Sequence, residues 1–231
     1  MKTVLVTGAN RGIGLEFCRQ YAEAGWKVLA CCRSPDHADE LAGLAAKFAT
    51  VTVHALDVAN FAQIDALSRH LRDEPIDVLI CNAGVYGDRD AQGFGALDYE
   101  RWRETLTINT LAPVKLTEAL MPQIARSDMK LVVAITSLMG SIADNSSGRS
   151  IFYRSSKAAL NAAMKTLAID LKGRGFGVLI LHPGWVRTDM GGDEAPTSPT
   201  ESVAGMRRVI DDFRREETGR FLNFRGEELP W

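Results

Sequence analysis

The 231-residue sequence has almost no net charge and no long apolar run. Its 27 basic and 29 acidic side chains give a formal charge of −2, so there is no electrostatic reason to expect nucleic acid or an anionic membrane as a partner. A membrane-spanning helix needs roughly 20 consecutive apolar residues, and the first residues, MKTVLVTGAN, are typical of a strand and a turn rather than a leader peptide. We therefore expect a cytoplasmic protein that binds neither nucleic acid nor membrane.

Cysteine is also scarce. The four cysteines do not have the spacing of metal ligands and lie mostly in apolar patterns, so we interpret them as reduced core residues and expect no metal site. The composition, 46% hydrophobic and 24% charged, is that of an ordinary globular protein. Because no break in composition divides the chain, we expect one domain over residues 1–231.

Short apolar runs alternate with longer segments of helical periodicity along the whole chain. A strand that is buried on both faces is apolar throughout, so this alternation indicates parallel strands joined by helical crossovers, an α/β fold. Strands are predicted over residues 3–7, 27–32, 51–55, 78–81, 131–136, 177–181 and 220–224. Helices are predicted over residues 12–24, 36–48, 61–71, 98–127, 153–174 and 200–217.

Two polar segments, residues 137–150 and 191–199, interrupt this alternation. Both are typical of surface loops, yet each follows the carboxyl end of a strand, where doubly wound sheets bind ligands. We expect both to contribute to function, and the second to belong to a lid over residues 188–200.

A glycine-rich turn joins the first strand to the first helix. Gly8, Gly12 and Gly14 form a G-x-x-x-G-x-G pattern that also contains Asn10, Arg11 and Ile13. Glycine lets the backbone approach a ligand closely, and the free N–H groups at a helix start favour an anion such as pyrophosphate. The position of the turn between strand and helix predicts a dinucleotide site.

The end of the second strand indicates which dinucleotide. An acidic residue there usually holds a 2′-hydroxyl, whereas a 2′-phosphate needs a cation. The sequence has Arg33 and no carboxylate before Asp36, and Arg11 supplies a second guanidinium, a group that suits phosphate. Both arginines are also compatible with an ordinary surface role, but together they favour NADP(H).

Asp57 and Val58 directly follow the third strand. The carboxylate of Asp57 would accept a hydrogen bond from an adenine amino group, and Val58 would pack on the ring. Asp57 is equally suited to cap the next helix. The residues alone leave both interpretations open.

Tyr153 and Lys157 lie four residues apart on a predicted helix and so share one face. The pKa of a phenol is ordinarily about 10, and a nearby ammonium brings it closer to neutral pH. Ser137, after the fifth strand, offers a hydroxyl to a substrate oxygen, although a serine there is also a common turn former. Asn109 interrupts an otherwise regular helix, and a water chain from Lys157 would be a partner for its buried amide.

Several motifs then occur in a characteristic order. They are Thr7-Gly8-x-x-x-Gly12-x-Gly14, Asp57-Val58, Asn82-Ala83-Gly84, Asn109, Ser137, Tyr153-x-x-x-Lys157 and Pro183-Gly184-x-x-x-Thr188. In this order they resemble the short-chain dehydrogenase/reductase family over residues 3–188. Within it the chain is most similar to C-factor-like and carbonyl-reductase-like members, through residues 140–145 and 226–231. It departs from the family in a longer spacing between Ser137 and Tyr153, which leaves Ser141 as an alternative to Ser137, and in Cys81, where asparagine is more usual.

The resemblance implies a single Rossmann-type domain with a seven-stranded parallel sheet, cofactor motifs mainly in residues 3–90 and a catalytic and substrate region in residues 100–231. It implies a catalytic tetrad of Asn109, Ser137, Tyr153 and Lys157. Lys157 would also hold the nicotinamide ribose, and Asn82, Ala83 and Gly84 would support the adenosine side. Pro183, Gly184, Val186 and Thr188 would contact the cofactor, Thr188 near the nicotinamide. A homodimer or homotetramer through the helices near residues 101–127 and 153–174 is implied as well.

The expected function is hydride transfer between NADPH and a small carbonyl or alcohol substrate, with Tyr153 as the proton donor or acceptor. An apolar or aromatic substrate is favoured because the residues predicted to flank the nicotinamide carry no fixed charge. These residues are Leu138, Met139, Tyr86, Trp185 and Met190, with Pro196 of the lid. The alternatives are an NADP(H)-binding sensor or signalling protein, and an epimerase or dehydratase that regenerates its cofactor in each turnover.

Overall fold

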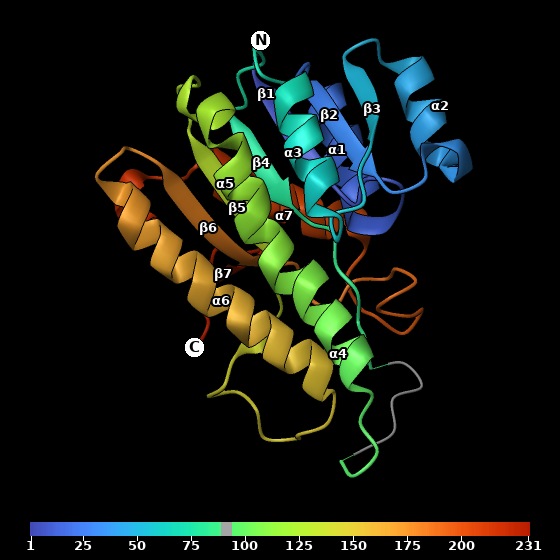
Figure 1. Ribbon diagram of the computed structural model, residues 1–231, viewed down its shortest axis with the longest axis vertical. Helices are drawn as coiled ribbons and strands as arrows, with labels where there is room; N and C mark the ends of the chain where they lie inside the picture. The colour runs from blue at the N-terminus through green and yellow to red at the C-terminus, as the bar shows by residue number, and fades with distance from the viewer. Residues whose placement is uncertain (89–93) are drawn as a thin grey trace.

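The computed structural model describes residues 1–88 and 94–231, and its centre is a seven-stranded parallel sheet (Figure 1). The strands lie in the order β3-β2-β1-β4-β5-β6-β7, and each neighbouring pair is parallel. This confirms the predicted fold class. The strands are β1 (Thr3–Thr7), β2 (Lys27–Cys32), β3 (Val51–Ala55), β4 (Val78–Cys81), β5 (Leu131–Ile135), β6 (Gly177–His182) and β7 (Phe221–Asn223).

Helices cover both faces of the sheet. The first face packs against α3 (Phe61–His70), α5 (Ala112–Ala125) and α6 (Ile151–Lys172). The opposite face packs against α1 (Gly12–Glu23), α2 (Asp39–Lys47) and α7 (Pro199–Asp211). The strand order reverses between β1 and β4, and ligands of doubly wound sheets bind beyond the carboxyl ends of the strands at such a point.

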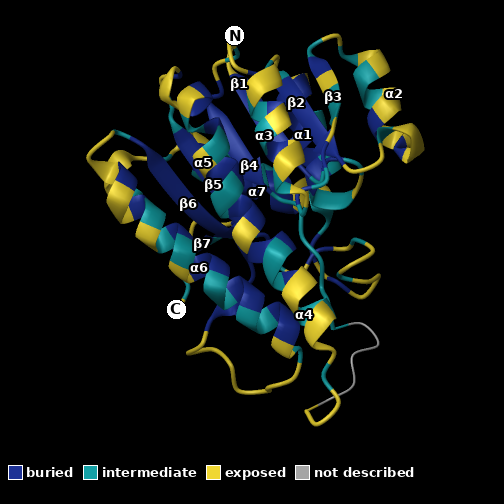
Figure 2. Ribbon diagram, in the orientation of Figure 1, coloured by how far each residue is buried: buried dark blue, intermediate teal, exposed yellow. Residues whose placement is uncertain are grey.

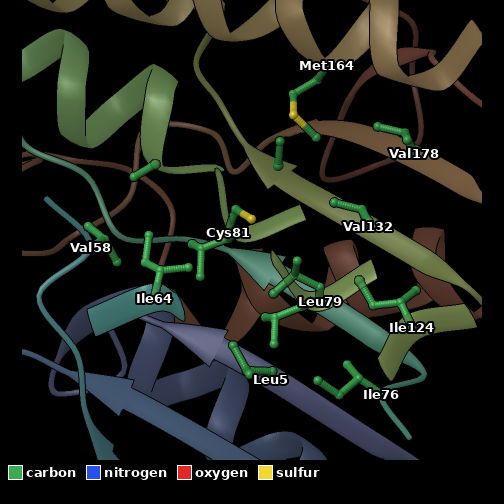
Figure 3. Close-up of a cluster of buried hydrophobic side chains, with 14 of the residues drawn as sticks. Leu5, Val58, Ile64, Ile76, Leu79, Cys81, Ile124, Val132, Met164 and Val178 are labelled. Carbon is green, nitrogen blue, oxygen red and sulfur yellow. The ribbon is translucent and has the colours of Figure 1, made fainter. Parts of the chain in front are cut away.

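The central strands are apolar throughout because both of their faces are buried (Figure 2). Leu5, Leu79, Val132 and Val178 lie in register on four neighbouring strands and form a row across the first face. Figure 3 shows this row with Met164 of α6 nearby. Alternate residues of β1, such as Val4, pack against the helices of the opposite face.

The predicted helix over residues 98–127 is divided into three parts. These are α4 (Tyr99–Leu106), a π-helical turn η2 (Thr107–Leu111) and α5. Pro113 explains the wider turn, because it lacks the N–H group that would bond the carbonyl of Asn109 in an α-helix. Asn109 lies in this turn, and π-turns within helices are frequent at functional sites.

Other boundaries differ by a few residues. Helix α6 begins at Ile151, before the predicted start at Tyr153, and α7 ends at Asp211 rather than at Glu217. Short 3₁₀ turns are η1 (Pro35–His37), η3 (Leu138–Gly140) and η4 (Arg215–Glu217). Among residues 1–88 and 94–231, no helix combines the length and apolar character needed to cross a membrane.

Candidate active site

The loops after β1 and β4 are joined at the carboxyl edge of the sheet. The Asn82 side chain donates through Nδ2 to the carbonyl oxygens of Thr7, at 2.9 Å, and Gly8, at 3.3 Å. The backbone N–H groups of Asn82 and Ala83 donate to the Thr7 hydroxyl, both at 3.1 Å. The Asn82–Ala83–Gly84 loop is therefore fixed against the glycine turn, as a shared ligand site requires.

The glycine turn leaves backbone room that a side chain would fill. A Cβ atom at Gly14 would lie 2.1 Å from the Gly8 carbonyl oxygen, and Gly8 and Gly12 have positive φ angles of 67° and 55°. Asn10 is half-buried, Ile13 packs on the core, and the start of α1 has no side-chain cap. Uncapped N–H groups at a helix start suit an anion, so the turn fits a dinucleotide pyrophosphate.

The two arginines predicted to recognise a 2′-phosphate differ in their surroundings. Arg11 pairs with Asp189, and both side chains are 68% exposed. Arg33 is exposed, and its guanidinium makes no ion pair with any residue in 1–88 or 94–231. The N–H of Ala9 donates to the Cys31 carbonyl at 3.0 Å, so the glycine turn is tied to the end of β2 that leads to Arg33.

Asn60, rather than Asp57, caps helix α3, because its side chain accepts a hydrogen bond from the N–H of Gln63 at 3.3 Å. Within residues 1–88 and 94–231, the Asp57 carboxylate accepts one hydrogen bond, from the N–H of Ala59 at 3.0 Å. Val58 is buried at the edge of the core (Figure 3).

Ser137, Tyr153 and Lys157 come together where β5 ends against α6. Tyr153 and Lys157 are 9% and 4% exposed, and the Lys157 Nζ atom lies 5.7 Å from the centre of the Tyr153 ring. Lys157 donates to the carbonyl oxygen of Ile135 at 2.9 Å. The Ser137 hydroxyl accepts a hydrogen bond from the N–H of Met139 at 3.1 Å. Ser141, the alternative to Ser137, instead donates to the Trp231 carbonyl at 3.2 Å.

Burial shifts both titratable groups of this cluster away from their charged forms. It raises the pKa of Tyr153 to about 12, an effect that neighbouring Tyr86 adds to and contact with Ser137 opposes. It lowers the pKa of Lys157 to about 8. The sequence predicted that Lys157 lowers the pKa of Tyr153. In the structure the Lys157 ammonium donates to the Ile135 carbonyl, and burial is the largest cause of the shift at Tyr153.

Asn109 lies fully buried in the π-turn, beside the same cluster. Its side chain accepts from the N–H of Val85 at 2.9 Å and donates to the Val85 carbonyl at 2.8 Å and to the Ser156 hydroxyl at 2.9 Å. The amide thus joins the loop after β4 to α6, whereas the sequence suggested a water chain from Lys157 as its partner. A Cβ atom at Gly84 would lie 3.2 Å from Asn109 Oδ1 and 3.6 Å from Lys157 Nζ, so all three residues are adjacent.

The loop after β6 reaches the glycine turn. Gly184 has a φ angle of 85°, and the Pro183 carbonyl accepts a hydrogen bond from Ser202 at 2.6 Å. The segment from Thr188 to Pro196 is closed at its base by a bridge between Val186 and Thr197, and α7 follows at once. A Cβ atom at Gly12 would lie 3.2 Å from Thr188, which places the predicted lid against the cofactor turn.

The residues predicted to form the substrate pocket lie in three places: beside Tyr153, in η3 and at the loop after β6. Tyr86 lies beside Tyr153, with ring centres 5.0 Å apart, and Leu138 and Met139 are half-buried in η3. Trp185 and Met190 are 57% and 45% exposed at the loop after β6, whereas Pro196 lies at its closing bridge. Sequence reasoning missed Asp88, whose carboxylate binds the start of α6.

The parallel sheet and the glycine turn are those of a Rossmann-type fold, and the buried group of Ser137, Tyr153 and Lys157 lies beside the turn region, as in an oxidoreductase of that class. The family model described as short chain dehydrogenase matches residues 2–198. The chain belongs to this family, as the order of its motifs indicated.

Relatives and solved structures extend this result. C-signal of Myxococcus xanthus is 46% identical over 157 residues, which cover 68% of this chain and 93% of that protein. The 1-hydroxy-2-glutathionyl-2-methyl-3-butene dehydrogenase of Rhodococcus sp. (strain AD45) is 36% identical over the full length of both chains. The NADPH-bound carbonyl reductase from chicken fatty liver has a TM-score of 0.92 and 33% identity, covering 100% of this chain and 99% of the other.

The lowered pKa of Lys157 predicts a pH-dependent contribution to stability. Between about pH 8 and the ordinary lysine pKa of about 10.5, the unfolded chain binds more protons than the folded chain at this position, so the contribution to unfolding free energy rises with pH. We expect the stability of Lys157→Met relative to wild type to fall by about 2–3 kcal/mol between pH 7 and pH 10. Urea unfolding at both pH values measures this difference, and a difference independent of pH would contradict it.

Proposed function

We propose that this protein is an NADPH-dependent carbonyl reductase in which Tyr153 is the proton donor. The observation that carries the proposal is the cluster of Ser137, Tyr153 and Lys157, which is buried and adjacent to the Gly84 loop. The carbonyl reductase among the solved structures and the dehydrogenase among the relatives support the reaction class.

Bound NADPH would supply the hydride that is added to the carbonyl carbon. Tyr153 would transfer its phenolic proton to the carbonyl oxygen, to which Ser137 would donate a hydrogen bond. Tyr153 is protonated at neutral pH, which is the form that this direction uses, while burial raises its pKa and makes the phenol a weaker acid. Lys157 remains largely protonated below its pKa of about 8 and would stabilise the phenolate after transfer.

Tyr153 must then recover a proton. The side chain of Asn109 is already bonded to Val85 and Ser156. We propose that Asn109 contributes to this proton return through its main-chain carbonyl. Pro113 has no N–H group, so this carbonyl lacks its usual α-helical donor. That oxygen would hold a water molecule able to pass a proton towards Lys157.

The cofactor would extend along the carboxyl edge of the sheet. The turn containing Gly8, Asn10, Gly12, Ile13 and Gly14 would bind the pyrophosphate, with Arg11 and Arg33 on the 2′-phosphate. Asp57 and Val58 would contact the adenine, and Lys157 the nicotinamide ribose. The remaining contacts would come from Asn82, Ala83, Gly84, Tyr153, Pro183, Gly184, Val186 and Thr188.

We propose an apolar or aromatic carbonyl compound as the substrate. Tyr86 borders Tyr153, and Trp185 and Met190 present apolar surface at the loop after β6. Apolar and aromatic walls with few polar groups are typical of small-molecule pockets.

A signalling function is the second candidate, favoured by the 46% identity to C-signal. A protein that only senses NADPH needs the nucleotide turn but has no use for a buried proton donor. Tight NADPH binding without turnover across a broad carbonyl panel would support signalling, whereas turnover supports the reductase.

Replacing Tyr153 with phenylalanine tests the proton donor directly. Because the substitution removes only the phenolic oxygen, we expect kcat for carbonyl reduction to fall by about 10²- to 10⁴-fold while NADPH affinity stays near that of wild type. NADPH oxidation and a binding titration measure the two quantities. Tyr99→Phe, on the exposed side of α4, is the matched control. Wild-type turnover in Tyr153→Phe would refute the assignment.

Cofactor preference depends on the arginines. We expect Arg33→Ala to raise the KM for NADPH about tenfold and to leave the KM for NADH almost unchanged, because a charge-assisted bond to the 2′-phosphate is lost. Arg11→Ala should have the smaller effect, since Arg11 is already paired with Asp189. Arg69→Ala, another exposed arginine, is the control. Equal effects of Arg33→Ala on both cofactors would contradict the role.

We also propose that the chain forms a homo-oligomer through α5 and α6. The small residues Ala158, Ala159 and Ala163 of α6 are only partly buried, Ala162 is exposed, and Ile169 is 65% exposed on the same helix. Packing within the chain therefore leaves this face of α6 partly exposed, and a second copy of the chain would cover it.

Wild type should elute with at least twice the mass of the 25.3 kDa chain. Ala162→Arg should elute as a monomer, because a long charged side chain replaces a small contact residue. Ala66→Arg, at an exposed position of α3, should leave the mass unchanged. Light scattering measures these masses, and a monomeric wild type would overturn the proposal.

A further inference from the structure

The helix that carries Tyr153 begins without a cap of its own. Gly148, Arg149 and Ser150 have positive φ angles of 64°, 57° and 49°, and Ser150 makes no side-chain capping bond. Positive φ is unfavourable for arginine and serine. The residues before α6 therefore provide no side-chain cap, and the first N–H groups of the helix need hydrogen-bond acceptors from another part of the molecule.

Asp88 provides that partner from 64 residues earlier in the chain. Its carboxylate accepts hydrogen bonds from the N–H groups of Phe152, at 3.2 Å, and Tyr153, at 2.8 Å. A carboxylate in this position satisfies two unpaired donors and interacts favourably with the positive end of the helix dipole. One of its two bonds is made to the proposed proton donor itself.

The segment that carries Asp88 is held between three elements. Val85 is bonded to Asn109 in the π-turn. The Tyr86 hydroxyl lies 2.6 Å from the Ser150 hydroxyl at the entry to α6. Gly87 has a φ angle of 77°, and a Cβ atom there would lie 2.3 Å from the Thr105 hydroxyl of α4. Figure 1 shows α4 and the first turns of α6 side by side below the sheet.

We propose that Asp88 is a positioning residue that fixes Tyr153 relative to the cofactor loop, an inference that rests on the proposed reductase function. The segment 82–88 starts at the loop joined to the glycine turn and ends at the Tyr153 N–H. A displacement of the first turn of α6 would move the phenol away from the loop that supports the cofactor. Proton transfer is sensitive to such a displacement, because the donor must lie within hydrogen-bond reach of the substrate oxygen.

The test compares Asp88→Ala and Asp88→Asn with Asp98→Ala. Asp98 caps α4 and, like Asp88, accepts two backbone N–H bonds, both at 3.0 Å, but its helix does not carry Tyr153. The measurements are kcat, the KM for the carbonyl, NADPH affinity, the isotope effect with NADPH deuterated at the transferred position, and hydrogen exchange at the amides of Phe152 and Tyr153.

We expect Asp88→Ala to lower kcat about tenfold while NADPH affinity changes less than about twofold. The isotope effect on kcat should rise, because the chemical step becomes more rate-limiting, and amide exchange at Phe152 and Tyr153 should accelerate. Asp88→Asn keeps one acceptor oxygen and should be intermediate. Asp98→Ala should lower thermal stability comparably without changing kcat or the isotope effect.

Each result separates this inference from the proposed function. If wild type turns over carbonyls and Asp88→Ala has the kcat and isotope effect of Asp98→Ala, the positioning role is refuted while the reductase stands. Unchanged amide exchange in Asp88→Ala refutes the contact itself, whatever the turnover. A wild type that oxidises no NADPH refutes the reductase, and with it a role for Asp88 in turnover. If Asp88→Ala does not fold, Asp88→Asn carries the same comparison.

Discussion

The hydrogen bonds from Asn82 to Thr7 and Gly8 fix the loop after β4, and both halves of the site depend on that loop. On one side it is held against the glycine turn, where α1 begins. On the other it continues to Val85, whose backbone is bonded twice to the Asn109 side chain. The glycine turn and helix α6 are thus connected by a few bonded residues, although they are far apart in the sequence.

Burial of Tyr153 and Lys157 creates a second constraint. Desolvation opposes a phenolate at Tyr153 and an ammonium at Lys157, so burial favours the neutral form of both groups. The Ile135 carbonyl gives the ammonium one partner but no opposite charge. A ligand that brings charge to this site would therefore change the proton affinity of both groups, which is the behaviour that a proton donor in a hydride-transfer reaction requires.

The parts of the fold that the sequence predicted well are those set by local pattern. The central strands follow from short apolar runs, and the glycine turn from its spacing. The long helical stretch was predicted as one helix, and its π-turn was not foreseen, because the effect of Pro113 on the carbonyl of Asn109 depends on one missing N–H group and hardly alters the periodicity. Asp88 was missed because its two bonds span 64 and 65 residues, a separation that no local sequence pattern reveals.

The contact between Arg11 and Asp189 shows why residue type alone does not define a phosphate site. Both side chains are largely exposed, and an ion pair in that setting is worth at most about 1 kcal/mol, so Arg11 can exchange its partner for a phosphate at little cost. Thr188, next to Asp189, already contacts the glycine turn at Gly12. Any ligand that draws Arg11 away also removes one of the contacts between the cofactor turn and the loop after β6. Under the proposed function, cofactor binding would therefore affect the position of that loop, which carries Trp185 and Met190, the residues proposed to contact the substrate.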